Sequence, residues 1–165
     1  MRIRILSACA RRAAPLASDP GIMPTHAEKR VLPHAAERLF DLVADVKRYP
    51  EFLPWCVGVR IRQYEDTRVL ADMVIGYKVF RERFSSVVTL SRPDRIDVEY
   101  SDGPFKYLKN YWIFRPVGES TCEIDFYVDF EFRSRLLQKM IVPVFNQAVR
   151  RMVTAFELRA DDLYD

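Results

Sequence analysis

The longest helical pattern in this chain lies at residues 134–163, which read SRLLQKMIVPVFNQAVRRMVTAFELRADDL. Apolar side chains recur there every three or four residues, a spacing that places them on one face of an α-helix. The face consists of Leu137, Ile141, Val144, Ala148, Met152, Ala155 and Phe156. It is widened by Leu136, Met140, Phe145, Val149 and Val153, beyond what one contact with a sheet requires. The helix therefore either packs on a sheet as an ordinary core helix or also forms a wall of a cavity.

Pro143 interrupts this helical pattern. A proline inside a helix removes a backbone hydrogen-bond donor, and its ring clashes with the preceding turn. Residues 136–142 are therefore predicted to form a separate or kinked short helix. The roughly 20 residues from Pro143 onward, at 1.5 Å each, reach about 30 Å, which is long enough to cross a small sheet.

Length and composition indicate one folded domain. The chain has 165 residues, of which 49% are apolar, and this suffices for one sizeable core but not for two ordinary domains. No apolar run approaches the roughly 20 residues that a membrane-spanning helix needs. The net charge is +3, and four arginines and one aspartate within residues 1–22 account for all of it. Residues 23–165 are therefore balanced in charge, which argues against DNA binding through a broad cationic surface.

Residues 1–22 differ from the rest of the chain. They are rich in Arg, Ala and Ser and nearly free of acidic residues, as mitochondrial transit peptides are. A simpler interpretation is that Met23 is the true start. We therefore expect residues 1–22 to be a disordered or misannotated extension, and residues 23–165 to form the domain.

The sequence contains no familiar motif for catalysis or metal binding. It has no G-x-S-x-G, no glycine-rich phosphate loop and no H-E-x-x-H. Cys9, Cys56 and Cys122 form no C-x-x-C pair, which disfavours a zinc site or a disulfide framework. His26 and His34 are expected to face solvent. We predict a protein that is not an enzyme, with no catalytic residue, no metal and no cofactor.

Strand-like alternation dominates the middle of the chain. A first strand is predicted at residues 27–32, and a first helix from Pro33, where a missing donor costs nothing, to about residue 46. Further runs of alternating apolar and polar residues, separated by short turns, predict an antiparallel meander with one dry face. These runs cover residues 57–61, 69–77, 80–90, 96–100, 108–114 and 122–132. With the long helix, they give an α+β domain of two layers.

The segment at residues 48–56, RYPEFLPWC, is more aromatic than a connecting loop requires. Pro50 and Pro54 restrict its backbone angles. The aromatic or apolar side chains around them are Tyr49, Phe52, Leu53 and Trp55. This segment either plugs one end of the core or forms a hydrophobic lid over the mouth of a pocket.

Three polar residues fall in phase with the apolar faces of the predicted strands. They are Glu82, Ser86 and Asn110. An unpaired polar group is costly in such a position. They either pair with one another or with backbone groups, or they offer hydrogen bonds to the polar head of an otherwise apolar ligand.

Several motifs together resemble those of a known family. They are the octapeptide at residues 49–56 with Asp45 upstream, Gly103-Pro104-Phe105, Trp112-Ile113-Phe114, Asp129-Phe130-Glu131-Phe132, and Phe156-Glu157-Leu158-Arg159-Ala160. In these motifs the chain resembles the coenzyme Q-binding START-like family, within the polyketide cyclase/START superfamily, from about Thr25 to Tyr164. That family includes the mitochondrial ubiquinone-binding chaperone and bacterial relatives, one branch of which is described as a ribosome-association toxin.

The resemblance implies a START-like helix-grip fold, in which a curved antiparallel sheet wraps around a long C-terminal helix with a hydrophobic cavity between them. It also implies non-enzymatic binding of ubiquinone or a similar polyisoprenoid lipid in support of cellular respiration. The side chains expected to bind it are Tyr49, Phe52, Leu53, Pro54, Trp55, Met73, Ile75, Phe84, Asn110, Trp112, Phe126 and Met152. Those expected to dock on a membrane surface are Leu136, Leu137, Met140 and Ile141, beside basic residues. The alternative is that this short helix simply packs on the sheet.

The same resemblance leaves other functions open. A ribosome-binding regulator that blocks subunit association would need a cationic face, and the candidates are Arg60, Arg62, Arg68, Arg81 and Arg83. An enzyme of the superfamily would need polar groups that converge in the cavity. Glu82 with Asn110 is the only candidate pair, and it gives minimal support for an active site. As a lipid carrier, the protein is expected in the bacterial cytoplasm at the inner membrane, with respiratory complexes as partners, or in mitochondria if residues 1–22 are a transit peptide.

Overall fold

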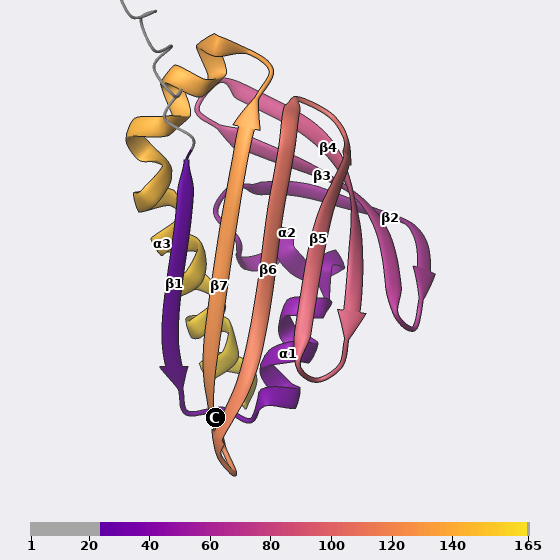
Figure 1. The fold of residues 1–165 in the computed structure, drawn as a ribbon, viewed down its shortest axis with the longest axis vertical. Helices are drawn as coiled ribbons and strands as arrows, with labels where there is room; N and C mark the ends of the chain where they lie inside the picture. The colour runs from indigo at the N-terminus through magenta and orange to yellow at the C-terminus, as the bar shows by residue number, and fades with distance from the viewer. Residues whose placement is uncertain (1–23, 165) are drawn as a thin grey trace, which may run out of the picture.

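The computed structural model describes residues 24–164, so the predicted extension at 1–22 and Cys9 lie outside the described residues. The order of its elements is strand, helices, six strands and a long helix (Figure 1). They are β1 (Thr25–Leu32), α1 (Ala36–Ala44), the 3-10 turn η1 (Val46–Arg48), α2 (Tyr49–Phe52), β2 (Cys56–Glu65), β3 (Arg68–Tyr77), β4 (Phe80–Ser91), β5 (Arg95–Asp102), β6 (Phe105–Gly118), β7 (Thr121–Phe132) and α3 (Arg135–Tyr164).

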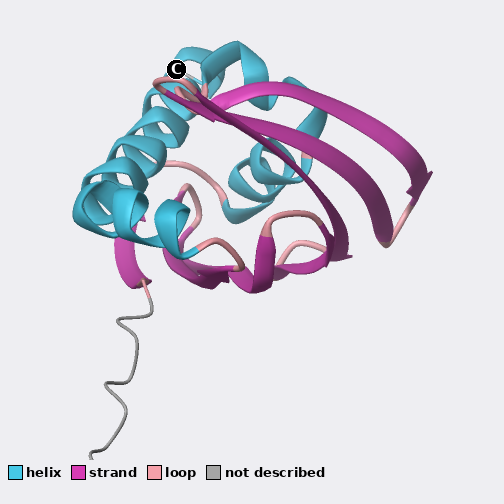
Figure 2. Cartoon of the chain, turned by 90° about the horizontal axis from the view of Figure 1, so that it is seen from above, coloured by secondary structure: helices cyan, strands magenta, loops and turns pink. Residues whose placement is uncertain are grey.

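The strands form one antiparallel sheet in the order β1-β7-β6-β5-β4-β3-β2. The meander from β2 to β7 is joined at its end by β1, which pairs with β7 over its whole length, from Thr25 opposite Asp129 to Leu32 opposite Cys122. Seen from above, the sheet curves round the helices on one side (Figure 2). The alternation in the sequence thus produced a sheet with one face toward the helices, which confirms the predicted α+β fold.

α3 is one continuous helix that contains Pro143. The separate short helix considered for residues 136–142 was therefore wrong, whereas the kinked alternative agrees with the bend near the start of α3 in Figure 1. Pro143 itself is exposed, as is Lys139, the residue whose carbonyl loses its helical partner. At such an exposed position water can replace the missing helical donor, which is why the helix tolerates the proline.

An aromatic cluster fastens α3 to the concave face of the sheet. Trp112 on β6 has its ring centroid 4.5 Å from that of Phe126 on β7 and 5.0 Å from that of Phe156 on α3. All three side chains are buried. Aromatic pairs at these separations add to the free energy gained from burial, so this cluster fixes where the C-terminal half of α3 lies.

The start of α1 differs from the prediction, and His34 is the reason. The helix begins at Ala36 rather than Pro33, and the side chain of His34, in the β1–α1 connection, is only 3% exposed. His34 Nε2 lies 2.8 Å from Asp161 Oδ1, and its ring packs edge-on against Tyr164. The expectation that His34 faces solvent was wrong, because the end of α3 covers it.

Candidate functional site

A cavity of about 300 Å³ lies between the concave face of the sheet and α3. Side chains from β2 to β7, the η1–α2 segment and α3 line it, and most of them are apolar. No histidine, lysine, arginine or aspartate among the described residues belongs to the lining. Its volume is at the small end of the range of about 300–1,000 Å³ that is usual for ligand pockets.

Ten of the twelve residues expected to bind a ligand line this cavity: Tyr49, Leu53, Trp55, Met73, Ile75, Phe84, Asn110, Trp112, Phe126 and Met152. Phe52 and Pro54 lie outside the lining. The Phe52 ring packs on Phe156, at 5.1 Å between centroids, and under the Arg159 guanidinium group, while Pro54 is exposed. The binding role of all twelve residues stays a prediction.

The aromatic segment at residues 48–56 is a short folded unit that forms part of the cavity wall. The Tyr49 hydroxyl donates a hydrogen bond to the Val43 carbonyl at 2.5 Å, and burial raises the pKa of Tyr49 above its ordinary value. Trp55 Nε1 donates to the Ala148 carbonyl of α3 at 3.4 Å, and the Trp55 ring packs against Tyr77 at the end of β3, at 5.2 Å. Trp55 therefore ties the segment to both the sheet and the helix.

The four residues expected to dock on a membrane divide into two pairs. Leu137 and Ile141 line the cavity, whereas Leu136 is 65% exposed and Met140 is half-buried outside the lining. Exposed Arg135 and Lys139 flank them. Among residues 24–164, no helix is long and apolar enough to cross a membrane.

The three polar residues that the sequence placed on the apolar face all line the cavity. Asn110 Nδ2 donates a hydrogen bond to the Tyr127 carbonyl at 2.8 Å, so one of them pairs with the backbone. Glu82 and Ser86 form no hydrogen bond or ion pair with any residue in the described part of the chain. The three residues therefore do not pair with one another in this structure.

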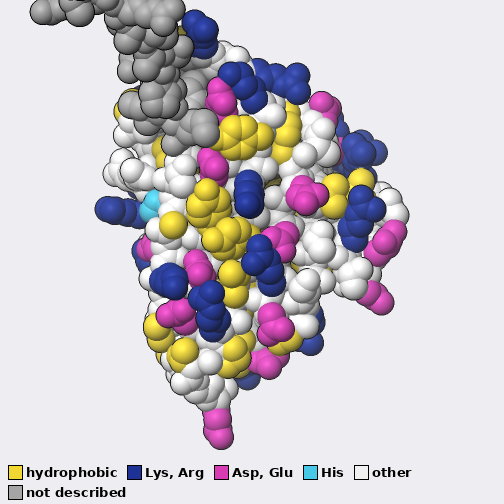
Figure 3. Space-filling view, in the orientation of Figure 1, with side chains coloured by type: hydrophobic (Ala, Val, Ile, Leu, Met, Phe, Trp, Pro, Cys, Tyr) yellow, Lys and Arg dark blue, Asp and Glu magenta, His cyan; other side chains and the backbone are white. Residues whose placement is uncertain are grey.

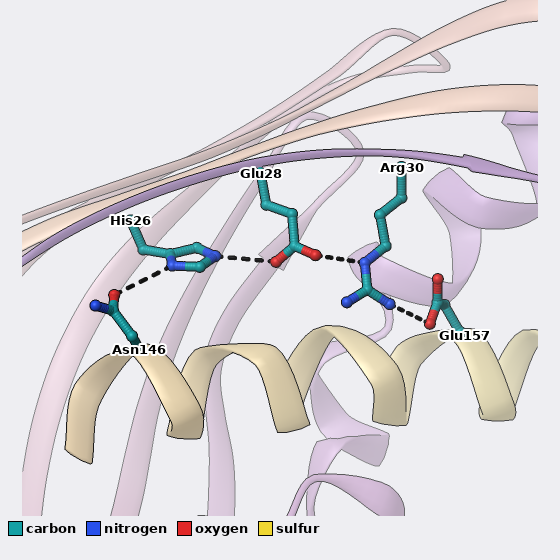
Figure 4. A network of polar contacts seen from close by, with 5 residues as sticks. All are labelled: His26, Glu28, Arg30, Asn146 and Glu157. Carbon is teal, nitrogen blue, oxygen red and sulfur yellow. Dashed lines mark hydrogen bonds and ion pairs between the residues drawn. The ribbon is translucent and has the colours of Figure 1, made fainter.

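A polar network that sequence reasoning missed joins β1 to α3 (Figure 4). His26 lies 2.9 Å from Glu28 and 3.4 Å from Asn146, Glu28 accepts a hydrogen bond from Arg30 at 2.5 Å, and Arg30 also pairs with Glu157. The expectation that His26 faces solvent was wrong, since its side chain is 10% exposed. The signal was the alternation in β1, where positions 26, 28 and 30 share one face with the buried Leu32.

This network predicts a specific dependence of stability on pH. Burial by itself would raise the pKa of Glu28, but hydrogen bonds and charges from His26 and Arg30 outweigh it and hold the pKa below 4.5. A carboxyl group whose folded-state pKa is depressed stabilises the protein above its unfolded pKa, and this contribution is lost as the pH falls through the folded value. Glu28→Gln should therefore lower the free energy of unfolding, measured by urea titration. This loss should be largest near pH 7 and shrink below about pH 4.5. A difference that grows on acidification would contradict this.

The five arginines considered as a cationic face are not equivalent. The buried Asp72 on β3 accepts hydrogen bonds from Ser85 at 2.6 Å and Arg83 at 2.5 Å, and Arg62 lies 3.5 Å away. The hydrogen bond from Ser85 and the contact with Arg83 hold the pKa of Asp72 below its ordinary value. Arg60, Arg68 and Arg81 are exposed and form no ion pair with any residue at 24–164. On the outer face shown in Figure 3, basic and acidic side chains are intermingled.

Comparison with known proteins identifies the family. A model of the family "Polyketide cyclase / dehydrase and lipid transport" matches residues 32–157. The chain belongs to this family. Its fold is thus the START-like helix-grip fold. The solution structure of the 18 kDa protein CC1736 from Caulobacter crescentus is similar, with a TM-score of 0.70 and 35% sequence identity, and the match covers 86% of this chain and 99% of the CC1736 chain.

Relatives of two kinds, which carry different names, are similar to this chain in sequence. The ribosome association toxin RatA of Pseudomonas aeruginosa is 36% identical over 143 residues, which are 86% of this chain and 99% of that protein. The mitochondrial coenzyme Q-binding protein COQ10 homolog B of Xenopus laevis is 33% identical over 157 residues, which are 92% of this chain and 63% of that protein. The family resemblance drawn from the sequence is confirmed, and its two named branches are both represented.

Proposed function

We propose that this chain binds a polyisoprenoid quinone, or a lipid of similar chemistry, in the cavity between its sheet and α3, and that it does so without catalysing a reaction. The observation that carries the proposal is the cavity itself, whose walls are apolar apart from a few polar groups. Apolar ligand surface gains about 25 cal/mol for each Å² withdrawn from water. The similarity to a coenzyme Q-binding protein supports the choice of ligand.

The size of the cavity limits what it can hold. About 300 Å³ accommodates a ring and the first part of a tail, but not a tail of many isoprene units. The remainder would leave past Leu137 and Ile141, next to the exposed Leu136 and the basic residues Arg135 and Lys139. An apolar residue among basic ones suits the surface of an anionic membrane. We further propose that the protein acts at the cytoplasmic surface of a bacterial inner membrane, or in mitochondria if residues 1–22 are a transit peptide, where it would support respiration.

We propose binding without catalysis because of the residues that line the cavity. Among the residues described, Glu82 is the one lining side chain that carries a carboxyl, imidazole or amino group, the groups that most often act as general acids or bases. The buried thiol of Cys56 also lines the cavity, and burial raises its pKa to about 11, which disfavours a nucleophilic role. A general base without a second convergent group is weak support for an enzyme.

Ligand content of the natively purified protein tests the proposal. The wild type, produced in a host that makes ubiquinone and analysed by organic extraction and mass spectrometry, should carry ubiquinone in near-stoichiometric amount. Val98→Trp fills the cavity from β5 and should lower this content at least about fivefold, because the ring site is then occupied. Val87→Trp is the matched control, since it adds the same side chain to the opposite face of the sheet. A wild type without any quinone would contradict the proposal.

Ribosome association is a second candidate, which the similarity to RatA favours. Arg60 and Arg81 are exposed and form no ion pair with residues 24–164, so they are the groups best suited to contact phosphates. We expect the double variant Arg60→Glu/Arg81→Glu to reduce co-sedimentation with ribosomal subunits at least about tenfold if this candidate is correct. The exposed Lys29, on the far edge strand, provides a control as Lys29→Glu. Wild-type protein that stays at the top of the gradient would exclude the candidate.

A further inference from the structure

Three polar residues of the cavity lining lie on two strands of the sheet, β4 and β6. Glu82 and Ser86 are both on the concave face of β4, and Asn110 lies on β6, with β5 between them. Ser86 is only 5% exposed, although its side chain borders the cavity. These three residues contribute polar groups to a lining that is otherwise mostly apolar or aromatic.

The hydrogen-bonding capacity of these three residues is mostly that of acceptors. Asn110 donates one of its two amide N–H groups to the Tyr127 carbonyl, which leaves one N–H donor and the amide oxygen as an acceptor. An ionised glutamate has no proton to donate, and Glu82 has no partner among residues 24–164. The Ser86 hydroxyl, equally without a partner in this part of the chain, can donate or accept.

Tyr100 extends the set of unsatisfied groups. It lies directly opposite Ser86 in the β4–β5 register, and its hydroxyl is buried without a hydrogen-bond partner. Buried polar groups in folded proteins are nearly always hydrogen-bonded, so unpaired ones call for an explanation. Tyr100 itself does not line the cavity, so the groups that face a ligand are the Ser86 hydroxyl, the Glu82 carboxylate and the Asn110 amide oxygen, and these suit a ligand head that makes several hydrogen bonds.

The Glu82 carboxylate indicates which chemical form of ligand head the cavity would bind. A ligand that fills the cavity removes water from Glu82, and this is costly unless the ligand donates a hydrogen bond in return. The oxygens of an oxidised quinone ring accept hydrogen bonds only, and they would meet Glu82 as acceptor against acceptor. The reduced hydroquinone ring has the same shape and tail but carries two hydroxyl donors, and its oxygens can still accept from Ser86.

We infer that the cavity selects the reduced, hydroquinone form of its quinone, with Glu82 accepting a hydrogen bond from a ring hydroxyl. The inference rests on the proposed function, because it concerns the ligand of the same cavity. It assigns Glu82 a role in distinguishing the two redox forms, and it involves no electron transfer by the protein.

Calorimetric titration of the full chain with decylubiquinone and with decylubiquinol, under anaerobic conditions at pH 7, tests the inference. The dissociation constant of the reduced form should be at least tenfold lower, equivalent to about 30 mV for a two-electron couple. Glu82→Gln supplies an amide donor that suits a quinone carbonyl, so the ratio should fall below about two or reverse. Glu99→Gln is the matched control on the opposite face of the sheet and should retain the tenfold preference.

Each outcome bears on a different claim. Equal affinities of the wild type for the two forms, or an unchanged ratio in folded Glu82→Gln, would overturn the inference and leave the proposed function standing. Failure of the wild type to bind either form would overturn both. Circular dichroism of Glu82→Gln ensures that a change in the ratio reflects the lost carboxylate rather than unfolding.

Discussion

Gly103→Ala is expected to destabilise the protein by about 3 kcal/mol or more. Gly103 has φ of +136°, a conformation in which a side chain is strained by about 1–3 kcal/mol. A Cβ at this position would also lie 2.7 Å from the Arg83 carbonyl oxygen and 2.8 Å from Phe84 Cβ on β4. Backbone cannot move aside as a flexible side chain can, so the turn between β5 and β6 would have to shift.

The consequences of such a shift reach the cavity. Arg133 donates hydrogen bonds to the carbonyls of Pro104 and Phe105, so this turn also holds the connection between β7 and α3. The Phe105 ring lines the cavity and stacks on Phe132 at 4.7 Å. Gly103→Ala should therefore lower both the urea midpoint and the ligand content.

Gly58→Ala is the control for this prediction. No atom lies within 4 Å of a Cβ built at Gly58, and its φ lies outside the strained region. Its effect on the free energy of unfolding should stay within about 0.5 kcal/mol, as for most surface substitutions. Equal effects of the two substitutions would show that the strain and the close approach at Gly103 do not matter.

The parts of the fold that follow from local periodicity were predictable. The strict alternation at residues 122–132 gave β7 (Thr121–Phe132), and the three-to-four spacing at residues 134–163 gave α3 (Arg135–Tyr164). In both β7 and α3 one face is buried in the core, and the spacing of the apolar residues indicates which face it is. The same alternation correctly placed Glu82, Ser86 and Asn110 toward the cavity.

The parts that depend on partners distant in the sequence were not predictable in this way. His26 faces Asn146 across 120 positions, and His34 faces Asp161 across 127. Each histidine is covered by α3. The alternation in β1 places His26 on the inner face of the sheet, but no local pattern encodes which residues of a distant helix cover His26 or His34. Asp72 is similar, because Arg62 and Arg83 reach over it from neighbouring strands and bury it on a face that alternation assigns to solvent.

Trp112→Ala is expected to have an equally large effect, a loss of about 3–5 kcal/mol in the free energy of unfolding. Trp112 is 4% exposed and its ring packs between Phe126 and Phe156, so its removal joins a new void to the existing cavity. The surrounding side chains belong to both the sheet and α3, and they cannot close the void without moving the helix.

Trp55 provides the matched comparison, because it also lines the cavity but is half-buried and lies in a connection. Trp55→Ala should cost less than about half as much, since it loses one weak hydrogen bond to α3 and the contact with Tyr77. Guanidinium titrations monitored by far-UV circular dichroism measure both values. If Trp55→Ala proved the more costly, α3 would be held mainly through the aromatic segment rather than through the cluster around Trp112, and the cavity would be closed by that segment.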